Sequence, residues 1–229
     1  MSESKNRQWI LAARPTGNLT GNEFRWKEAP IPQTADGQVL VRNLWLSFDP
    51  TQRGWMARDS YLPMVPLGEV MRAFGVGQVI ETRLPEFRKG DLVQGMFGWQ
   101  DYVATDAQSA GGLRKLAPQV SPNLALSLFG ITGTTAYFGM TEIGQIKAGE
   151  TVVVSGAAGS TGSVAGQIAK IKGCRVIGTA GGKEKCDWLV QAVGFDGAID
   201  YKSEDVGARL SALCPNGSTS SSTTSAELF

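Results

Sequence analysis

The stretch from Val152 to Gly162 constrains the fold of this chain more than any other segment. Three valines, typical of a strand buried on both faces, lead into small residues and glycines, and the helix-like segment 164–170 follows. Gly159 would let the backbone approach a pyrophosphate, and Gly162 would let the helix pack close to the strand. Ala157 replaces the first glycine of G-x-G-x-x-G, so the match is a variant. Alone, such a motif does not separate a nucleotide site from an ordinary glycine-containing turn.

The residues that follow supply the context for this turn. We expect a second strand over 174–180, a helix over 183–193, a third strand over 197–201 and a third helix over 204–213. In the first of these helices, Trp188, Leu189 and Ala192 are expected on one side. Alternating strands and helices with short links predict a parallel α/β unit with right-handed crossovers.

Because this unit begins with the glycine turn, dinucleotide binding is the favoured interpretation. The free N–H groups of the first helical turn would face the phosphates. The candidate cofactor-binding residues of the turn are Ala157, Ala158, Gly159, Ser160, Thr161 and Gly162.

The end of the second predicted strand indicates which dinucleotide is bound. NAD sites usually place Asp or Glu about 20 residues after the glycines, where it bonds the ribose hydroxyls. Here Ala180 is followed by two glycines, the second of them the candidate cofactor residue Gly182, and then by Lys183 and Lys185. A missing acid with added cations suits a 2′-phosphate, so the sequence favours NADP(H). The alternative is that the lysines only form a solvated helix start, and Glu184 between them dilutes their charge.

Length and charge exclude several classes of protein. A chain of 229 residues allows one large or two modest domains. A net charge of +1 without a basic stripe gives no support for nucleic-acid binding. There is no apolar signal core and no apolar run approaching ~18 residues, so we expect a soluble, cytoplasmic protein without membrane association.

Cysteine and histidine usage limits the chemistry. The 3 cysteines, Cys174, Cys186 and Cys214, are widely spaced, which indicates reduced thiols in a reducing compartment. The count of 0 histidines excludes His-based acid–base catalysis and His-ligated metals. Because no Cys-x-x-Cys pair occurs either, we expect no metal site.

Residues 1–125 carry a different pattern, which predicts a β-rich domain of short, bent strands. Strand-like apolar content lies in 38–48, 69–82 and 91–105, with glycines and prolines between. Residues 124–141 predict one or two helices that join this domain to the nucleotide unit at 126–217.

Several short motifs occur in a fixed order along the chain: Arg7–Trp9, Ser47–Pro50, Arg53–Gly54, Gly98–Tyr102, Gly130–Gly139, Gly156–Gly162, Gly166–Lys170, Ala180–Gly182, Gly194–Asp196 and Tyr201–Lys202. In this order they resemble the zinc-independent medium-chain dehydrogenase/reductases, in the branch of prostaglandin, curcumin and alkenal reductases. The resemblance covers nearly all of 8–217. It implies an α/β protein in which a β-rich GroES-like barrel domain precedes the first half of a Rossmann-type parallel α/β domain. It also implies NADPH-dependent reduction of the carbon–carbon double bond of enones and enals.

The resemblance adds cofactor-binding residues one by one. Lys185 matches the family's 2′-phosphate lysine, and Tyr201 matches a tyrosine beside the same phosphate. Thr132, Gly133 and Thr135 match the interdomain segment that passes close to the cofactor. For Tyr201 the alternative is that it simply closes the third strand.

The resemblance also implies a substrate pocket. Asp49, Pro50 and Arg53 match the signature that borders the cleft, and Tyr61 loosely matches a tyrosine near the substrate, our candidate catalytic residue. Residues 51–52, Thr and Gln, replace the usual Tyr-Met pair and alter the pocket. From the residues alone, Tyr61 is a loop aromatic and Asp49 is a turn acid.

The implied chemistry needs few side chains. Hydride would reach the β-carbon of an enone, and a donor such as a tyrosine or the nicotinamide ribose hydroxyl would stabilise the enolate oxygen. The absence of histidine is compatible with this reaction.

The last residues depart from the resemblance. Relatives continue after Gly217 into a fourth strand, whereas every residue of 218–225 is serine or threonine. Such a segment predicts a disordered tail over 218–229, a C-terminally truncated chain, and an uncovered edge on the first strand of the nucleotide unit.

Three functions therefore remain open. The first is an NADPH-dependent enone or enal reductase acting on a small molecule, a homodimer in its full-length form. The second is a non-catalytic nucleotide-binding or interaction fragment of such a reductase. The third is a quinone reductase of the same superfamily.

Overall fold

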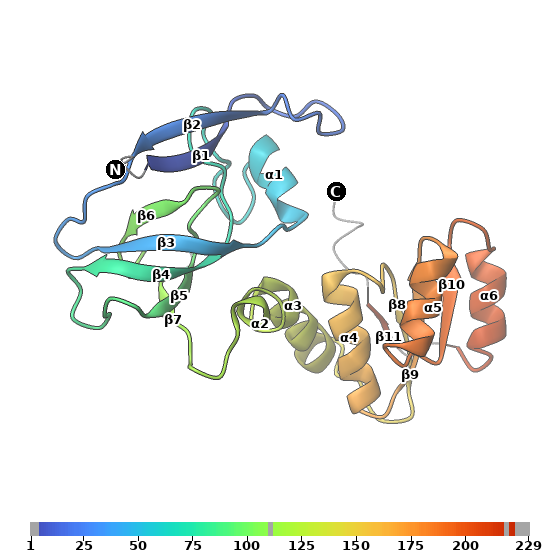
Figure 1. The fold of residues 1–229 in the computed structure, drawn as a ribbon. Coiled ribbons are helices and arrows are strands. Elements are labelled where there is room, and N and C mark those ends of the chain that lie inside the picture. The colour runs from blue at the N-terminus through green and yellow to red at the C-terminus, as the bar shows by residue number, and fades with distance from the viewer. Residues whose placement is uncertain (1–4, 110–111, 218–219, 223–229) are drawn as a thin grey trace. The chain divides into compact units, whose positions relative to one another are not determined.

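The computed structural model describes residues 5–109, 112–217 and 220–222. The chain divides into two compact units, Met1–Leu126 and Ser127–Phe229, and each is described by itself (Figure 1).

Unit 1 is built on a five-stranded antiparallel sheet in the order β6-β3-β4-β5-β7, beside the antiparallel hairpin β1-β2. Its elements are β1 (Lys5–Leu11), β2 (Phe24–Pro30), β3 (Val39–Leu46), α1 (Thr51–Ala57), β4 (Gly75–Thr82), β5 (Leu92–Gly95), β6 (Tyr102–Thr105), β7 (Arg114–Lys115) and α2 (Pro122–Leu126). The predicted β-rich N-terminal domain is confirmed. The hairpin and α1 were not predicted, because neither carries a clear apolar period.

Glycines let the strands of unit 1 approach closely. A Cβ on Gly77 would lie 2.4 Å from Val41 Cγ1, which explains a glycine in the middle of β4. The register of β3 against β4 shifts at two places, and such irregularities bend a strand. The core over this sheet includes Val39, Val79 and Phe97.

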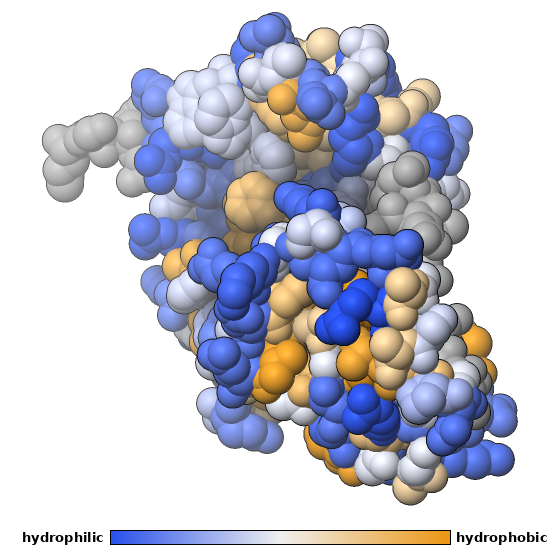
Figure 2. Space-filling model, turned by 90° about the vertical axis from the view of Figure 1, so that its right-hand side faces the viewer, coloured by the Kyte–Doolittle hydropathy of each residue, from blue (hydrophilic) through white to orange (hydrophobic). Residues whose placement is uncertain are grey.

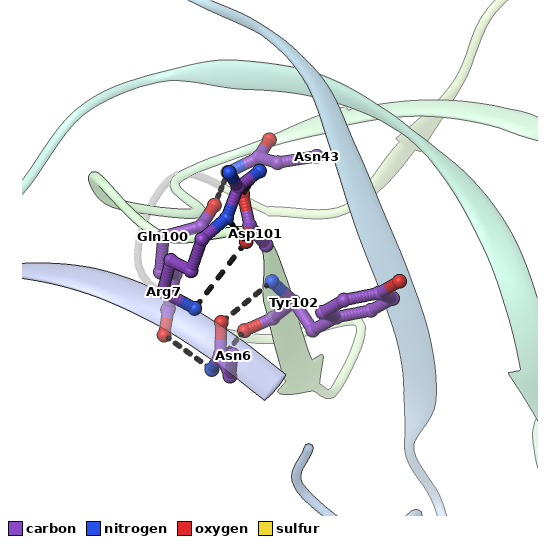
Figure 3. Close-up of polar contacts among 6 residues, drawn as sticks. All are labelled: Asn6, Arg7, Asn43, Gln100, Asp101 and Tyr102. Atoms are coloured by element: carbon purple, nitrogen blue, oxygen red, sulfur yellow. Dashed lines mark hydrogen bonds and ion pairs between the residues drawn. The ribbon is translucent and has the colours of Figure 1, made fainter. Parts of the chain in front are cut away.

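A polar cluster fastens the hairpin to the segment before β6 (Figure 3). The buried Asn6 side chain pairs with the backbone of Tyr102, donating to its carbonyl oxygen and accepting from its N–H, both at 2.9 Å. Arg7 Nε donates to Asp101 Oδ2 at 2.5 Å, and Asn43 Nδ2 donates to the Gln100 carbonyl at 2.9 Å. Two motifs far apart in sequence, 7–9 and 98–102, are thus held together by structural contacts.

Unit 2 holds the parallel sheet, in the order β10-β9-β8-β11. Its elements are α3 (Ile131–Phe138), the π-helix η1 (Gly139–Ile143), β8 (Thr151–Val154), α4 (Ser160–Ile171), β9 (Arg175–Ala180), α5 (Lys183–Gln191), β10 (Gly197–Asp200), α6 (Val206–Leu213) and β11 (Ser220–Ser222). The predicted α/β unit is confirmed, with its first three strands in the order 3-2-1. Its core includes Val152, Val154, Val176, Leu189 and Phe195.

One expected helix face was wrong. Leu189 on α5 is fully buried, whereas Trp188 is 44% exposed and Ala192 is exposed. Neighbouring helix positions differ by about 100° in direction, so Trp188 and Leu189 cannot both face the sheet. Trp188 therefore lies at the border of the buried stripe.

The edge of β8 also differs from expectation. Ser220, Ser221 and Ser222 pair in parallel with Val152, Val153 and Val154, so this edge is covered where the sequence predicted it to be open. A strand edge offers backbone N–H and C=O groups that any extended backbone can pair, whatever its side chains. For 218–219 and 223–229, the predicted disordered tail falls outside the described residues.

Two further features of the fold concern its helices and one side of its surface. None of the helices in the described ranges has the length and apolar character that a bilayer crossing requires. The side of the molecule that bears α6 and β10 shows hydrophilic residues around separate apolar patches (Figure 2).

Candidate functional site

The turn between β8 and α4 forms the first part of the site. Gly156 has a φ of 55°, a conformation that favours glycine, and turns the chain out of the strand. Gly159 is the N-cap of α4 and provides no side-chain cap, and the first turn carries no acidic residue. The first i→i−4 bond runs from Ser163 N to Gly159 O at 2.9 Å. The backbone N–H groups of Ser160, Thr161 and Gly162 therefore begin α4 without intrahelical acceptors, which makes this end suited to an anion.

Gly162 is required by the packing of the helix on the turn. A Cβ at this position would lie 2.6 Å from Gly156 O and 2.9 Å from Ala157 Cα, both backbone atoms that cannot move cheaply. At Gly159 the nearest such contact is Gly156 O at 3.2 Å. Gly162 thus keeps α4 close to β8, as the sequence predicted.

The alanine in the glycine motif has a structural counterpart. Ala157 is fully buried, and its N–H donates to Thr179 O at 2.9 Å. A Cβ on Gly178 in β9 would lie 2.8 Å from Ala157 Cβ. The glycine at 178 therefore makes room for the alanine at 157, and the neighbouring Ala158 packs on the same core.

Asp200 organises the second part of the site, where β9 and β10 end. Its carboxylate accepts from Gly182 N at 2.8 Å, from Lys202 N at 3.0 Å and from Ser203 Oγ at 2.8 Å. These hydrogen bonds, first that from Gly182, lower the pKa of Asp200. The acid missing from the end of β9 thus has a counterpart at the end of β10, but its oxygens hold the loop together.

The lowered pKa predicts the pH dependence of this loop. The ionised Asp200 adds stability above the ordinary carboxyl pKa, and this contribution is lost as the pH falls through the lowered pKa. We expect Asp200→Asn to lower the melting temperature at neutral pH, with a difference from the wild type that shrinks as the pH falls below about 4, the ordinary carboxyl pKa, and vanishes only below the lowered pKa of Asp200. Thermal denaturation of both proteins across this range measures the effect, and a constant difference would contradict it.

The three lysines of this region have different surroundings. Lys183 forms an ion pair with Asp187 one turn along α5, Nζ to Oδ2 at 2.5 Å. Lys185 is exposed at the same end of the helix. A Cβ on Gly181 would lie 2.6 Å from the Tyr201 hydroxyl and 2.9 Å from Lys202 Cε, so both side chains lie against this glycine.

Lys202 was missed as a site residue by the sequence analysis. The signal was present, because Lys202 follows the third parallel strand and the carboxyl ends of such strands form the ligand edge of the sheet. Tyr201 and Lys202, which follow β10, therefore lie against Gly181 in the loop that leads into α5 and Lys185.

The predicted residues on α3 have local roles. A Cβ on Gly133 would lie 2.0 Å from Leu128 O, so the glycine is required by the turn that precedes it. Thr132 Oγ1 donates to Ser127 O at 3.1 Å, and Thr135 is exposed. For Thr132 and Gly133 the structure supplies a local structural reason, and the approach of all three residues to a cofactor stays a prediction.

The predicted substrate residues cluster around α1 in unit 1. Ser47 Oγ donates to Asp49 Oδ2 at 2.7 Å, so Asp49 acts within its own turn. Pro50 is the N-cap of α1, and Arg53 Nη2 donates to Gly17 O at 2.8 Å. Tyr61 is 66% exposed.

Tyr61 carries its polar atom on an exposed side chain. Its hydroxyl lies 3.1 Å from Thr51 Oγ1, and its ring packs edge-on against the buried Trp55, with centroids 6.2 Å apart. An anchored ring with an exposed hydroxyl is suited to donate a hydrogen bond.

The described residues form no metal site. Within 5–109, 112–217 and 220–222, no group of three His, Cys, Asp or Glu side chains is placed to hold an ion.

Family models and curated proteins match the chain along most of its length. The family described as "N-terminal domain of oxidoreductase" matches residues 7–113, and the one described as "Zinc-binding dehydrogenase" matches 160–226. The chain is 44% identical over 218 residues to the NADPH-dependent curcumin reductase of Escherichia coli, covering 94% of this chain and 62% of the relative. It is 39% identical over 219 residues to prostaglandin reductase 1 of Oryctolagus cuniculus, covering 95% and 60%. It is 39% identical over 223 residues to the NADP(+)-dependent 2-alkenal reductase of Nicotiana tabacum, covering 94% and 64%.

Solved structures agree with these matches. The crystal structure of CurA from Vibrio vulnificus has a TM-score of 0.85 at 43% identity, covering 93% of this chain and 62% of that one. The same protein in complex with NADPH gives 0.85 at 44% identity, covering 92% and 62%. This chain thus spans about 62% of the length of these relatives.

Proposed function

Because the chain belongs to the medium-chain dehydrogenase/reductase family, in the branch of curcumin, prostaglandin and alkenal reductases, we propose that it reduces the carbon–carbon double bond of α,β-unsaturated ketones and aldehydes with NADPH. The observation that supports this most is the N-terminus of α4, which follows the glycine turn and has no side-chain cap. The chain that carries it is 44% identical to an NADPH-dependent curcumin reductase. The activity and the substrate class are proposals for this chain, which spans about 62% of that relative.

The residues present fit the cofactor. The N–H groups of 160–162 would hold the pyrophosphate, and the close contacts at Gly162 keep them in place. Lys185, Tyr201 and Lys202 would hold the 2′-phosphate, and Gly182, at a φ of 104°, is the N-cap of the helix that carries Lys185. Thr132, Gly133 and Thr135 are proposed to border the cofactor beyond the pyrophosphate.

When bound, NADPH would supply the hydride that adds to the substrate β-carbon. The electron pair of the double bond then moves to the α-carbon and the carbonyl oxygen, and a solvent proton completes the reduction at the α-carbon. Tyr61 donates a hydrogen bond to that oxygen as it gains negative charge, which is the interaction that lowers the barrier. Asp49, Pro50 and Arg53 shape the wall that carries Tyr61 and bring the substrate into position.

A steady-state assay with a simple enone tests this proposal. Consumption of NADPH should yield the saturated ketone and should be unchanged by EDTA, because the residues that the structure describes include no group of three side chains placed to hold a metal ion. Reduction of quinones alone would favour a quinone reductase, and NADPH binding without turnover of either would favour a nucleotide-binding fragment. An alcohol product from an enal, or loss of activity with EDTA, would contradict the proposal.

Cofactor choice gives a separate prediction. We expect NADPH to bind more tightly than NADH, and Lys185→Glu to weaken NADPH binding by about 10- to 100-fold while NADH binding changes little, because a hydrogen bond to a charged group is worth ~1.5–3 kcal/mol. Lys183→Glu is the matched control, since Lys183 is paired with Asp187 on its own helix. Dissociation constants by calorimetry measure the effect. Equal wild-type affinity for the two cofactors would exclude a 2′-phosphate site.

Location and assembly complete the proposal. A cytoplasmic location is supported by three free cysteines, Cys174, Cys186 and Cys214. We also propose a homodimer for a full-length form, and sedimentation of such a chain tests it.

A further inference from the structure

Tyr61 is fixed on one side and free on the other. Its ring meets the ring of Trp55 at 75°, and Trp55 is 1% exposed, so the anchor is part of the core. The loop that carries Tyr61 is tied down as well, because Met64 N donates to Asp59 Oδ1 at 2.9 Å and Val65 N donates to Trp55 O at 2.8 Å. Only the direction of the phenolic O–H is left to be set by a neighbour.

Thr51 is that neighbour, and it is itself held firmly. It opens α1 directly after Pro50, and the buried side chain of Gln52 fixes the turn beside it. Gln52 donates to Ser47 O at 3.1 Å and to Arg72 O at 3.3 Å, and accepts from Asp49 N at 3.2 Å.

The β-branched side chain of Thr51 adds to this rigidity. Such a side chain has few χ1 conformations in a helix, so its hydroxyl is presented in a narrow range of directions. The 3.1 Å contact to the Tyr61 oxygen is therefore a preorganised contact.

We propose that Thr51 is the positioning residue for Tyr61: its hydroxyl donates to the Tyr61 oxygen and leaves the phenolic proton directed to the carbonyl oxygen of the substrate. This inference rests on the proposed enone reduction. Either oxygen of the pair can donate, and only this direction frees the tyrosine proton for a ligand. A chain of hydrogen bonds polarises its members, so the Thr51 bond strengthens the one that Tyr61 makes as negative charge develops.

Arg72 contacts the ring of Trp55, the residue that also anchors Tyr61. Its guanidinium carbon is 5.6 Å from the centroid of the Trp55 ring, and its Nη1 donates to Pro63 O at 2.7 Å. Burial lowers the pKa of Arg72, and the nearby Tyr61 opposes this shift. A fixed positive charge near Tyr61 thus favours negative charge on the oxygen that Tyr61 would bind.

Kinetics of four variants test the proposal. We expect Thr51→Val to lower kcat by about 5- to 10-fold with little change in KM, the effect of one net hydrogen bond, and Thr51→Ser to restore most of it. Tyr61→Phe should cost about 10²-fold, as for loss of one oxyanion donor. The double variant Thr51→Val/Tyr61→Phe should be no slower than Tyr61→Phe alone, because Thr51 acts only through Tyr61. The matched control, Thr141→Val on η1, should keep the wild-type rate.

Two kinetic results would overturn the proposal. One is an unchanged kcat in Thr51→Val, and the other is a double variant whose losses multiply. Melting temperatures of all variants separate these results from loss of the fold. A wild-type chain that reduces no enone would instead contradict the proposed function.

A second measurement does not depend on turnover. In protein labelled with 3-fluorotyrosine, the ¹⁹F resonance of Tyr61 is assigned by its loss in Tyr61→Phe. We expect Thr51→Val to shift this resonance and Thr51→Ser to leave it near the wild-type position. Equal shifts in both variants, or none in either, would show that the Thr51 hydroxyl does not set the environment of Tyr61.

Discussion

Gly162→Val is expected to weaken nucleotide binding strongly. The first side-chain atom would lie 2.6 Å from Gly156 O and 2.9 Å from Ala157 Cα, so α4 must move away from the turn. The N–H groups of 160–162 would then no longer converge on the pyrophosphate, and because each hydrogen bond to a charged group is worth ~1.5–3 kcal/mol, the loss of two of them weakens binding by about 100-fold or more. Overpacking of this kind also destabilises a domain by ~1–3 kcal/mol. We therefore expect Gly162→Val to lower the melting temperature and to weaken NADPH binding at least about 100-fold.

Gln167→Val is the control for this substitution. Gln167 is exposed on the same helix, so the variant carries the helix cost of a β-branched residue without the clash. Gly162→Ala should fall between the two, since it introduces the clashing Cβ alone. Calorimetric titration with NADPH below the melting temperature measures each variant. Binding by a folded Gly162→Val at wild-type strength would show that the N-terminus of α4 is not the pyrophosphate site.

The α/β unit could be predicted from the sequence because its signals are local. Valine-rich strands, one turn with its glycines, and short links determine a parallel sheet with few alternatives. The structure moves the boundaries slightly, with α5 ending at Gln191 and α6 beginning at Val206. Trp188 was wrongly predicted to lie on the buried face of α5. The spacing of apolar residues indicates where the buried face of a helix lies, but it does not fix how wide that face is.

The features that were missed depend on contacts between distant residues. The hairpin β1-β2 is held by Asn6 and Arg7, whose partners Tyr102 and Asp101 lie 96 and 94 positions away. Lys202 enters the candidate site because β10 lies beside β9, a neighbour relation between strands that no local sequence signal specifies. The contact of Thr51 with Tyr61 joins a helix start to a loop, and no spacing rule relates them.

The pairing of β11 with β8 could not be predicted, because a serine run has no apolar pattern. The serine- and threonine-rich composition predicted disorder, because such a prediction considers only how many apolar side chains can be buried. Backbone pairing at an open edge is not included in that count.

The second large effect expected is on stability, when the alanine at 157 and the glycine at 178 are exchanged. Gly178→Ala places a Cβ 2.8 Å from Ala157 Cβ, 3.0 Å from Phe195 Cδ2 and 3.1 Å from Leu189 Cδ1. The last two are ring and branch atoms that can shift, whereas Ala157 is fixed by the bond from its N–H to Thr179 O at 2.9 Å. We expect Gly178→Ala to destabilise the chain by ~1–3 kcal/mol.

Ala157→Gly should cost ~0.5–1 kcal/mol, from the lost side chain and the more flexible unfolded backbone. It should leave NADPH affinity unchanged, because a glycine at this place is the usual form of the motif.

The double exchange Ala157→Gly/Gly178→Ala decides whether the two positions compensate. With no Cβ at 157, the new Cβ at 178 loses its closest contact. The double variant should therefore be more stable than the sum of the single changes by at least ~0.5 kcal/mol, the lower range for residues in contact. Urea denaturation of the four proteins measures this coupling. If the two costs add within ~0.3 kcal/mol, Gly178 is not what admits Ala157, and the alanine would then be tolerated by relaxation of the turn itself.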